Sequence, residues 1–336
     1  MCGDFYTAVF SQEKFFNDYS VNAVLLNNIM LCRRMPELLI LTSPPASGKT
    51  FWIQSFANVM SDPVLVISPL RALADECKKN WGEKIIVMTP EEWMNKKVTA
   101  KVVVFDEFHL LSYWGNTFRP LMWEVFESLS VTSQLVVGLT ATLSRELQKE
   151  IQFIDSGFER ILWVDHGNQT LKWKPSSYVQ LTKRFMEKCI FSLRTEGTSL
   201  IFCQYREEVS LWEKRLKEHG FSVWSCRGGE AGEFSLRVAK ESPPQFIVST
   251  TVLSHGVNLP SIRRVFFFYP LRNKDFWIQM TARGGRRGED FQVFALEPPF
   301  GLRWSRTGNL LATGKISVKI FFSNLTNQLE QCFLKG

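Results

Sequence analysis

Short apolar runs alternate with amphipathic stretches through the first half of the chain. The runs lie at residues 38–41, 64–68, 84–88, 101–106, 134–140 and 159–164. Nearly continuous apolar character over so short a length is typical of parallel strands that are buried on both faces. Because helical patterns separate the runs, the first half predicts a parallel sheet wrapped by helices.

The same rhythm restarts in the second half, after a polar stretch that contains Gly and Pro. Strands are predicted at 198–205, 221–226, 245–250, 263–270 and 290–298, and helices at 206–220 and around 276–282. We therefore predict an α/β chain with two tandem domains, each a parallel sheet flanked by helices. The predicted boundaries are 1–165 for the first domain, 166–178 for the linker, 179–298 for the second domain and 299–336 for a short C-terminal extension.

Composition and charge narrow the class of protein. Of the 336 residues, 45% are apolar and 22% are charged, as in soluble globular proteins. The net charge of +7 favours a polyanionic partner. Seven cysteines without C-x-x-C spacing indicate reduced thiols in an intracellular protein rather than a disulfide frame or a zinc site. No apolar run approaches the roughly 18–20 residues of a membrane span, so we expect a cytoplasmic protein with no membrane partner.

The segment SPPASGKT, Ser43 to Thr50, lies between an apolar run and a helical pattern. In such a strand–loop–helix context, a Gly-Lys-Thr triplet is typical of a phosphate-binding loop. Backbone N–H groups of the loop and the positive end of the helix hold phosphate oxygens. Lys49 is expected to reach the β- and γ-phosphates, and the Thr50 hydroxyl is expected to bind Mg²⁺. The predicted nucleotide contacts of this loop are Pro45, Ala46, Ser47, Gly48, Lys49 and Thr50.

A second candidate site is VVVFDEFH, Val102 to His109, in which an apolar run ends in Asp106 and Glu107. The carboxyl ends of parallel strands are where ligands of open α/β sheets bind. Asp106 is predicted to hold Mg²⁺, as the second acidic element of phosphate-loop NTPases does. Glu107 is predicted to orient and deprotonate the attacking water.

With these two segments in place, the chain resembles the superfamily 2 helicases from about Leu38 to Gly288. Eight segments match the family's motifs I, Ia, Ib, II, III, IV, V and VI. In that order they are SPPASGKT (43–50), SPLRALADE (68–76), MTPEEW (88–93), DEFH (106–109), GLTATL (138–143), LIFCQYREEV (200–209), STTVLSHGVNLP (249–260) and QMTARGGRRG (279–288). DEFH has the DExH form, and SPLRALADE is similar to the form seen in superkiller-type and related DNA-repair helicases. The resemblance implies two RecA-like domains with ATP bound in the cleft between them.

The resemblance also implies roles for residues of the second domain. Arg283 and Arg286 match the two arginines that point across the cleft, and Arg286 would be the arginine finger. Gln279 would sense the nucleotide, Gly256 would line the cleft and Asn258 would contact the ribose. Phosphoryl transfer needs positive charge on the γ-phosphate in the transition state, so the implied site is complete only when the domains close.

Nucleic-acid contacts are predicted at strand–helix transitions, where N–H groups and helix N-termini can hold backbone phosphates without reading sequence. The predicted contacts are Pro69, Arg71, Thr89, Pro90, Arg227, Gly228 and Thr250. Thr140 and Thr142 are expected to link the ATP site to the strand.

The chain departs from the family pattern at several positions. Ser43, Pro45 and Ala46 replace the small residues favoured in motif I, and Ala282 and Gly284 exchange Gly and Ala in motif VI. A helix is predicted at 16–35, but no adenine-reading Gln motif is recognisable there. Fewer than 50 residues follow Gly288, so the accessory domains of superkiller-type relatives have no counterpart and a protein partner could supply them.

Three functions are consistent with these motifs. The first is an ATP-dependent helicase that moves along single strands and unwinds DNA or RNA, with the 3′-to-5′ direction implied by the resemblance. The second is a nucleic-acid-stimulated ATPase or translocase subunit that remodels nucleic acid with a partner. The third is a nucleotide switch without turnover, which the presence of Lys49, Glu107 and Arg286 argues against. A monomer that uses ATP and Mg²⁺ is expected.

Overall fold

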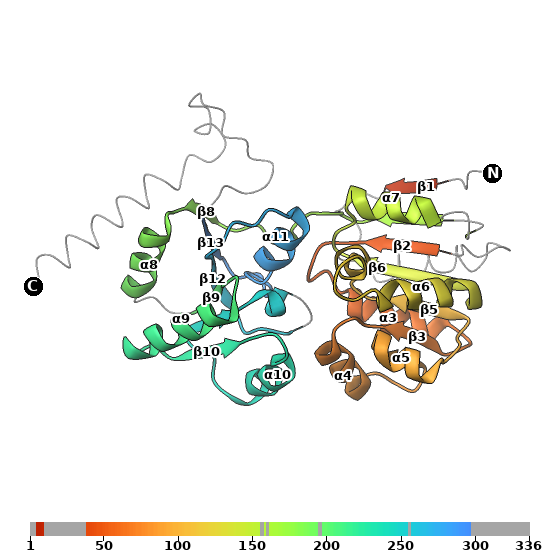
Figure 1. Cartoon of the computed structure of the whole chain (residues 1–336), viewed down its shortest axis with the longest axis horizontal. Helices are drawn as coiled ribbons and strands as arrows, with labels where there is room; N and C mark the ends of the chain where they lie inside the picture. Colours follow the sequence, from red (N-terminus) through yellow and green to blue (C-terminus); the bar gives the residue numbers. More distant parts are fainter. Residues whose placement is uncertain are drawn as a thin grey trace, which may run out of the picture.

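The computed structural model describes residues 5–9, 38–154, 158, 161–193, 197–254 and 257–296. Within them the chain forms two lobes that lie side by side, each built on one sheet with helices around it (Figure 1). The helix predicted at 16–35 and the extension predicted at 299–336 lie outside the described residues. No helix in the described part of the chain is long and apolar enough to cross a membrane.

The first lobe carries a seven-stranded sheet in which every neighbouring pair is parallel. Its strands, in spatial order, are β1 (Phe5–Val9), β7 (Ile161–Asp165), β2 (Leu38–Thr42), β6 (Leu135–Thr140), β5 (Val102–Phe105), β3 (Val64–Ile67) and β4 (Ile85–Met88). The four strands β2, β6, β5 and β3 are buried along their whole length, as their apolar runs predicted. The edge strand β1 was not predicted from the sequence.

Helices cover both faces of this sheet. On one face α3 (Lys49–Val59) and α4 (Arg71–Asn80) pack over a core that includes Phe56 and Ala74. On the other face the core includes Trp93, Phe126 and Leu147, which come from three further helices. These are α5 (Pro90–Lys96), α6 (Leu121–Thr132) and α7 (Arg145–Ile154).

The second lobe carries a six-stranded parallel sheet. Its strands, in spatial order, are β10 (Val223–Cys226), β11 (Phe246–Ser249), β9 (Thr198–Phe202), β12 (Ile262–Phe267), β13 (Gln292–Ala295) and β8 (Ser177–Gln180). Helices α8 (Lys183–Ser192) and α9 (Arg206–Glu218) pack on one face, and α10 (Ala231–Lys240) and α11 (Lys274–Thr281) pack on the other.

The segment between the sheets is anchored to the first lobe. The backbone N–H of Leu143 donates to Asn168 Oδ1 at 2.7 Å, and Asn168 Nδ2 donates to the carbonyl of Leu143 at 3.1 Å. Strand β8 begins at Ser177, inside the stretch predicted as linker. Helices α4 and α10 contact each other across the lobes, and α11 lies on the side of the second lobe that faces the first (Figure 1). Because the sheets are parallel, the loops at the carboxyl ends of β2 and β5 lie at one edge of the first sheet.

Candidate nucleotide site between the lobes

The predicted phosphate loop connects β2 to α3, and Lys49 is the first residue of the helix. Gly48 has a φ of 94°, a left-handed conformation that places it just before the helix. A Cβ at Gly48 would meet nothing within 4 Å, so this glycine is needed for its backbone conformation rather than for close packing. Ala46 also adopts a positive φ of 60°, which a residue with a Cβ rarely does.

Side chains of the loop hold its shape. The hydroxyl oxygens of Ser43 and Ser47 lie 2.8 Å apart and share a hydrogen bond. Lys49 Nζ donates to the carbonyl oxygens of Ser43 and Pro44, both at 3.2 Å. The lysine thus lies along the loop, and Ser43, which replaces the usual small residue, closes the loop through its hydroxyl.

The two carboxylates of DEFH lie directly after β5. The backbone N–H of Glu107 donates to Asp106 Oδ1 at 2.9 Å, and Glu107 itself has a positive φ of 48°. Burial and the neighbouring Glu107 raise the pKa of Asp106 to about 7, although Lys49 opposes the shift. Burial lowers the pKa of Lys49, and the two carboxylates oppose this change. These groups therefore share one poorly solvated charge cluster.

The second lobe contributes Gln279 from α11 and two arginines that follow the helix. Arg283 is only 2% exposed, and its Nη1 donates to the carbonyl of Val257 at 2.6 Å. Arg286 Nε donates to the carbonyl of Ala282 at 3.1 Å. Burial lowers the pKa of Arg286 to about 10, so this side chain stays positively charged at neutral pH. Burial, together with the nearby Arg286, moves the pKa of Arg283 well below its usual value.

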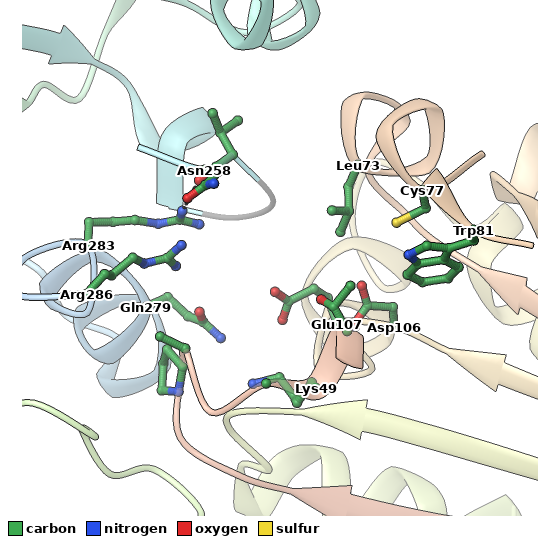
Figure 2. Close-up of a pocket in the computed structure, with 15 residues that line it drawn as sticks. Lys49, Leu73, Cys77, Trp81, Asp106, Glu107, Asn258, Gln279, Arg283 and Arg286 are labelled. Atoms are coloured by element: carbon green, nitrogen blue, oxygen red, sulfur yellow. Dashed lines mark hydrogen bonds between the residues drawn. The ribbon is translucent and has the colours of Figure 1, made fainter. Parts of the chain in front are cut away.

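One cavity of about 450 Å³ joins these groups from both lobes. Figure 2 shows Asp106 and Glu107 on one side of it and Gln279, Arg283 and Arg286 on the other. Of the predicted site residues, the cavity is lined by Pro45, Ala46, Gly48, Lys49, Thr50, Asp106, Glu107, Asn258, Gln279, Arg283 and Arg286. Ser47 is not part of the lining, and Gly256 lies outside the described residues.

Sequence reasoning missed one wall of the cavity. Leu73, Cys77 and Trp81 line it from α4 and the residue that follows this helix (Figure 2), and Val257 lines it from the second lobe. The three residues recur at a spacing of four, which places them on one face of a helix. That periodicity was available in the sequence, but the only site residues predicted in this segment, Pro69 and Arg71, were assigned to nucleic acid.

A chain of hydrogen bonds leads from DEFH to GLTATL. His109 Nδ1 lies 3.0 Å from the hydroxyl of Thr140, which donates to the carbonyl of Thr142 at 2.8 Å. His109 also lies 3.5 Å from Glu107 Oε2, and burial lowers the pKa of this histidine. Thr140 and Thr142 are buried in the first lobe, next to the carboxylates and away from the surface.

The predicted nucleic-acid contacts are spread over both lobes, at the ends of helices and strands. Thr89 caps α5, where its hydroxyl and its backbone N–H both bond to Glu92. Arg227 pairs with Glu213 at 2.9 Å and with Glu230 at 3.5 Å. The Thr89 and Arg227 side chains therefore have partners inside their own lobes, which the sequence pattern could not reveal, and the phosphate contacts at these two positions stay predictions.

The remaining predicted contacts are backbone sites or sit at element ends. Arg71 is exposed at the first turn of α4, and Thr250 is half-buried directly after β11. Pro69 and Pro90 are buried, and the carbonyl of Gly228 accepts a hydrogen bond from Arg206. Arg71 is the one exposed cation among the side chains predicted to contact nucleic acid.

An aromatic pair that was not singled out from the sequence follows DEFH: Trp114 is partly buried and Phe118 is exposed. Phe118 is 70% exposed, and its ring centre lies 5.4 Å from that of Trp114. The guanidinium of Arg119 lies 5.8 Å from the Trp114 ring and pairs with Glu91 at 2.6 Å. Trp114 thus packs against the first-lobe core and Arg119, whereas Phe118 leaves most of its surface exposed.

Comparison with known proteins identifies both lobes. Residues 78–150 match the model of the DEAD/DEAH box helicase domain, and residues 182–288 match that of the helicase conserved C-terminal domain. The chain is 23% identical over 306 residues to the ATP-dependent DNA helicase RecQ of Pasteurella multocida, which covers 83% of this chain and 47% of that protein. It is 25% identical over 221 residues to the ATP-dependent RNA helicase eIF4A of Kluyveromyces lactis, which covers 62% of this chain and 55% of that protein.

The chain thus spans about half the length of these two relatives. It is also 25% identical over 257 residues to the mouse exonuclease/helicase WRN, a match that covers 68% of this chain and 18% of that protein. Relatives of both RecQ and eIF4A type match. The DExH subtype and the likeness to superkiller-type helicases therefore stay predictions.

Solved structures confirm the predicted fold. Dbp5 of S. cerevisiae, bound to RNA and ADP BeF3, superposes with a TM-score of 0.63 at 17% identity, over 80% of each chain. The helicase Lhr of Mycobacterium smegmatis, bound to ssDNA and AMP-PNP, superposes with a TM-score of 0.60 at 17% identity, over 82% of this chain and 45% of that one. Two tandem RecA-like domains are the shared architecture. Together with the two domain matches, in this order on one chain, they indicate a superfamily 2 helicase.

Proposed function

We propose that this chain is an ATP-dependent nucleic-acid helicase, which hydrolyses ATP in the cleft between its lobes and uses the resulting lobe motion to move along a single strand and open duplexes. The observation that carries the proposal is the composition of one cavity. Lys49 and two carboxylates face Arg283 and Arg286 across it, so each lobe supplies charges that the other lacks.

The residues of the first lobe fit a triphosphate and its metal. The lysine and the start of α3 offer positive charge to phosphate oxygens. The Thr50 hydroxyl and the Asp106 carboxylate line the same cavity, and such oxygen ligands suit Mg²⁺. These two residues would hold the ion, whose charge, when bound, offsets negative charge on the phosphates.

Glu107 and Arg286 are assigned chemical roles from the positions of their side chains at the cavity. Glu107 lies at the cavity beside Asp106 and is our candidate for the group that orients the attacking water and accepts its proton. Arg286 stays charged at neutral pH and would stabilise negative charge on the transferring phosphoryl group.

Two buried donors support this reading of the second lobe. Gln279 Nε2 and Arg283 Nε have no hydrogen-bond partner among the described residues, and both side chains line the cavity. Buried donors without partners are costly, and a bound nucleotide would supply acceptors for them. Loss of the γ-phosphate on hydrolysis would then change the hydrogen bonds of the second lobe, which closes over the nucleotide.

The nucleic-acid side rests on different groups. The Trp114–Phe118 pair offers rings for base stacking, which tolerates any sequence. Exposed Arg71 offers charge to the backbone. Both single-stranded RNA and DNA remain candidate substrates, and the 3′-to-5′ direction is part of the proposal.

Strand displacement tests the proposal beside ATP hydrolysis. Tailed DNA and RNA duplexes with 3′ or 5′ overhangs are incubated with the chain and ATP, and Lys49→Ala serves as the control. Displacement of a 3′-tailed duplex that needs ATP and Lys49 supports the helicase. Strand-stimulated hydrolysis without displacement on any substrate would instead favour the second candidate, an ATPase or translocase subunit that remodels nucleic acid with a partner.

A further inference from the structure

Asp275 is a buried acid whose carboxylate accepts hydrogen bonds from two side chains outside its own lobe. It belongs to the first turn of α11 and is 2% exposed. The hydroxyl of Tyr113, in the first lobe, donates to its Oδ2 at 2.7 Å. Gln169, in the connecting segment, donates from Nε2 to its Oδ1 at 2.7 Å. A buried carboxylate is stable only when such donors compensate for lost solvation, so removal of either donor is costly.

Each donor is tied to a motif of the first lobe, Tyr113 by its position just after DEFH and Gln169 by a hydrogen bond to GLTATL. Tyr113 lies in the π-helical turn Leu111–Gly115, just beyond DEFH, and its ring centre is 6.1 Å from that of His109. The same ring lies 5.2 Å from Phe276 of α11, so apolar packing accompanies the hydrogen bond across the lobes. A π-helical turn is rare and is often found at functional sites.

Gln169 ties the same acid to GLTATL. Its backbone N–H donates to the carbonyl of Ala141 at 3.1 Å, and its φ of 55° shows that the backbone is held in a left-handed conformation. Lys274 Nζ donates to Gln169 Oε1 at 2.9 Å, which fixes the orientation of the amide. Asp275 is thereby joined to the turn that follows DEFH, through Tyr113, and to GLTATL, through Gln169.

The helix that carries Asp275 also carries the chemistry of the second lobe. Gln279 lies one turn further along α11, on the same face, and Arg283 and Arg286 follow its C-terminus. A short helix of eight residues moves as a unit, so a displacement at its first turn shifts all three cavity side chains. A misplacement of about 1 Å at a distance from the chemistry can cost about 100-fold in rate.

From these contacts we infer that Asp275 is a positioning residue: through Tyr113 and Gln169 it holds α11 against the first lobe, and so places Arg283 and Arg286 over the nucleotide. The inference rests on the proposed ATPase function. We call Asp275, Tyr113 and Gln169 the Asp275 junction. Through this junction, a change in the position of DEFH or GLTATL shifts Arg283 and Arg286.

The test is a double-mutant cycle on strand-stimulated ATP hydrolysis. Tyr113→Phe removes one donor and keeps the ring, whereas Asp275→Asn keeps the shape and leaves at most one of the two donors satisfied. Each variant is expected to lower kcat between about 10- and 100-fold with little change in KM for ATP, and the double variant is expected to lose no more than Asp275→Asn alone. Parental kcat in both single variants, or additive losses in the double variant, would overturn the inference.

Tyr178→Phe is the matched control. Tyr178 accepts a hydrogen bond from Trp277 of the same helix, but both residues belong to the second lobe. Its loss should lower thermal stability and leave kcat near the parental value. An equal loss of kcat in this control would show that α11 is merely sensitive to any lost bond, which contradicts a role across the lobes. Should Asp275→Asn fail to fold, the comparison of Tyr113→Phe with Tyr178→Phe decides the question alone.

A second readout separates this inference from the proposed function. If the parental chain hydrolyses no ATP under any condition, the proposed function fails, but the junction can still be measured by small-angle X-ray scattering. A larger radius of gyration in Tyr113→Phe and Asp275→Asn, but not in Tyr178→Phe, supports the junction. Identical values in all four proteins would contradict it.

Discussion

At the scale of single residues, the phosphate loop carries strain at one position. Ala46 has a φ of 60°, and the left-handed region costs a residue with a Cβ roughly 1–2 kcal/mol. Glycine meets no such cost, which gives a physical reason why the family favours glycine at this position. The strain is local to the loop and leaves the charges of the site in place.

Ala46→Gly is therefore expected to stabilise the chain slightly, by about 0.5 kcal/mol, since relief of strain exceeds the extra chain entropy of glycine. Urea unfolding measures the change. The matched control is Ala239→Gly, at an exposed position inside α10, where glycine should instead destabilise the helix by about 1 kcal/mol. Loss of stability in both variants would argue against strain at Ala46.

Asp106 is a second residue that the fold holds at a cost. Its pKa of about 7 in the folded chain lies above the usual 3.8, so the folded state binds its proton more tightly than the unfolded state. The carboxylate therefore lowers the free energy of unfolding fully above pH 7, and this penalty shrinks as the pH falls from 7 toward 4.

Asp106→Asn removes that penalty and keeps an oxygen that can accept from the N–H of Glu107. Without Mg²⁺ or nucleotide, we expect the variant to have a higher Tm than the parental chain at pH 8, and the difference to shrink at pH 5.5. Thermal unfolding by circular dichroism measures both. A gain in Tm that is larger at pH 5.5 than at pH 8 would have the wrong sign. The same variant should not hydrolyse ATP.

At the scale of elements, the stretch that follows β5 and runs through α6 has two kinds of aromatic side chain. Trp123 and Phe126 pack in the first-lobe core, whereas Phe118 is exposed against Trp114. Periodicity separates these groups only after the π-helical turn Leu111–Gly115 is known, because that turn shifts the phase of the pattern.

Phe118→Ala is expected to weaken single-strand affinity by about tenfold, since base–aromatic stacking contributes about 1–3 kcal/mol per base. Fluorescence anisotropy with a labelled single strand at fixed salt gives the Kd. Val131→Ala is the control. Val131 is also a strongly exposed apolar residue, at 87%, but it lies on α6 and outside the proposed strand contact. Equal Kd values for Phe118→Ala and the parental chain would remove this segment from the proposed strand contact.

Much of the element pattern could be predicted, and the misses have physical causes. Fully buried strands such as β2 and β5 can be recognised in the sequence as apolar runs. Strand β1 lies at an edge of the sheet, where one neighbour suffices and the sequence signal is weak. Long-range pairing is equally hard to predict: nothing near Arg227 in the sequence indicates that Glu213, on a different element, pairs with it.

At the scale of the whole molecule, the nucleotide site exists only as a meeting of two lobes. Sequence motifs predicted both halves of the cavity, because each half sits at strand or helix ends that the pattern defines. The Asp275 junction could not be predicted, since it depends on how the lobes are placed relative to one another. The α4 wall shows in the sequence only as a spacing of four residues, which does not by itself indicate what the helix faces. Because each lobe supplies part of the charged groups of the site, ATP hydrolysis as proposed requires the two lobes to close on each other. Such closure is the movement that a motor uses.

The most direct test of this account is the rate of ATP hydrolysis by Arg286→Ala, with and without a saturating single strand, beside ATP binding by the same variant. The account predicts that the strand stimulates the parental chain, that Arg286→Ala binds ATP nearly as well, and that its stimulated turnover falls by about 100-fold or more. Lys49→Ala and Glu107→Gln should likewise abolish turnover. Hydrolysis by Arg286→Ala at the parental stimulated rate would contradict a site completed by the second lobe.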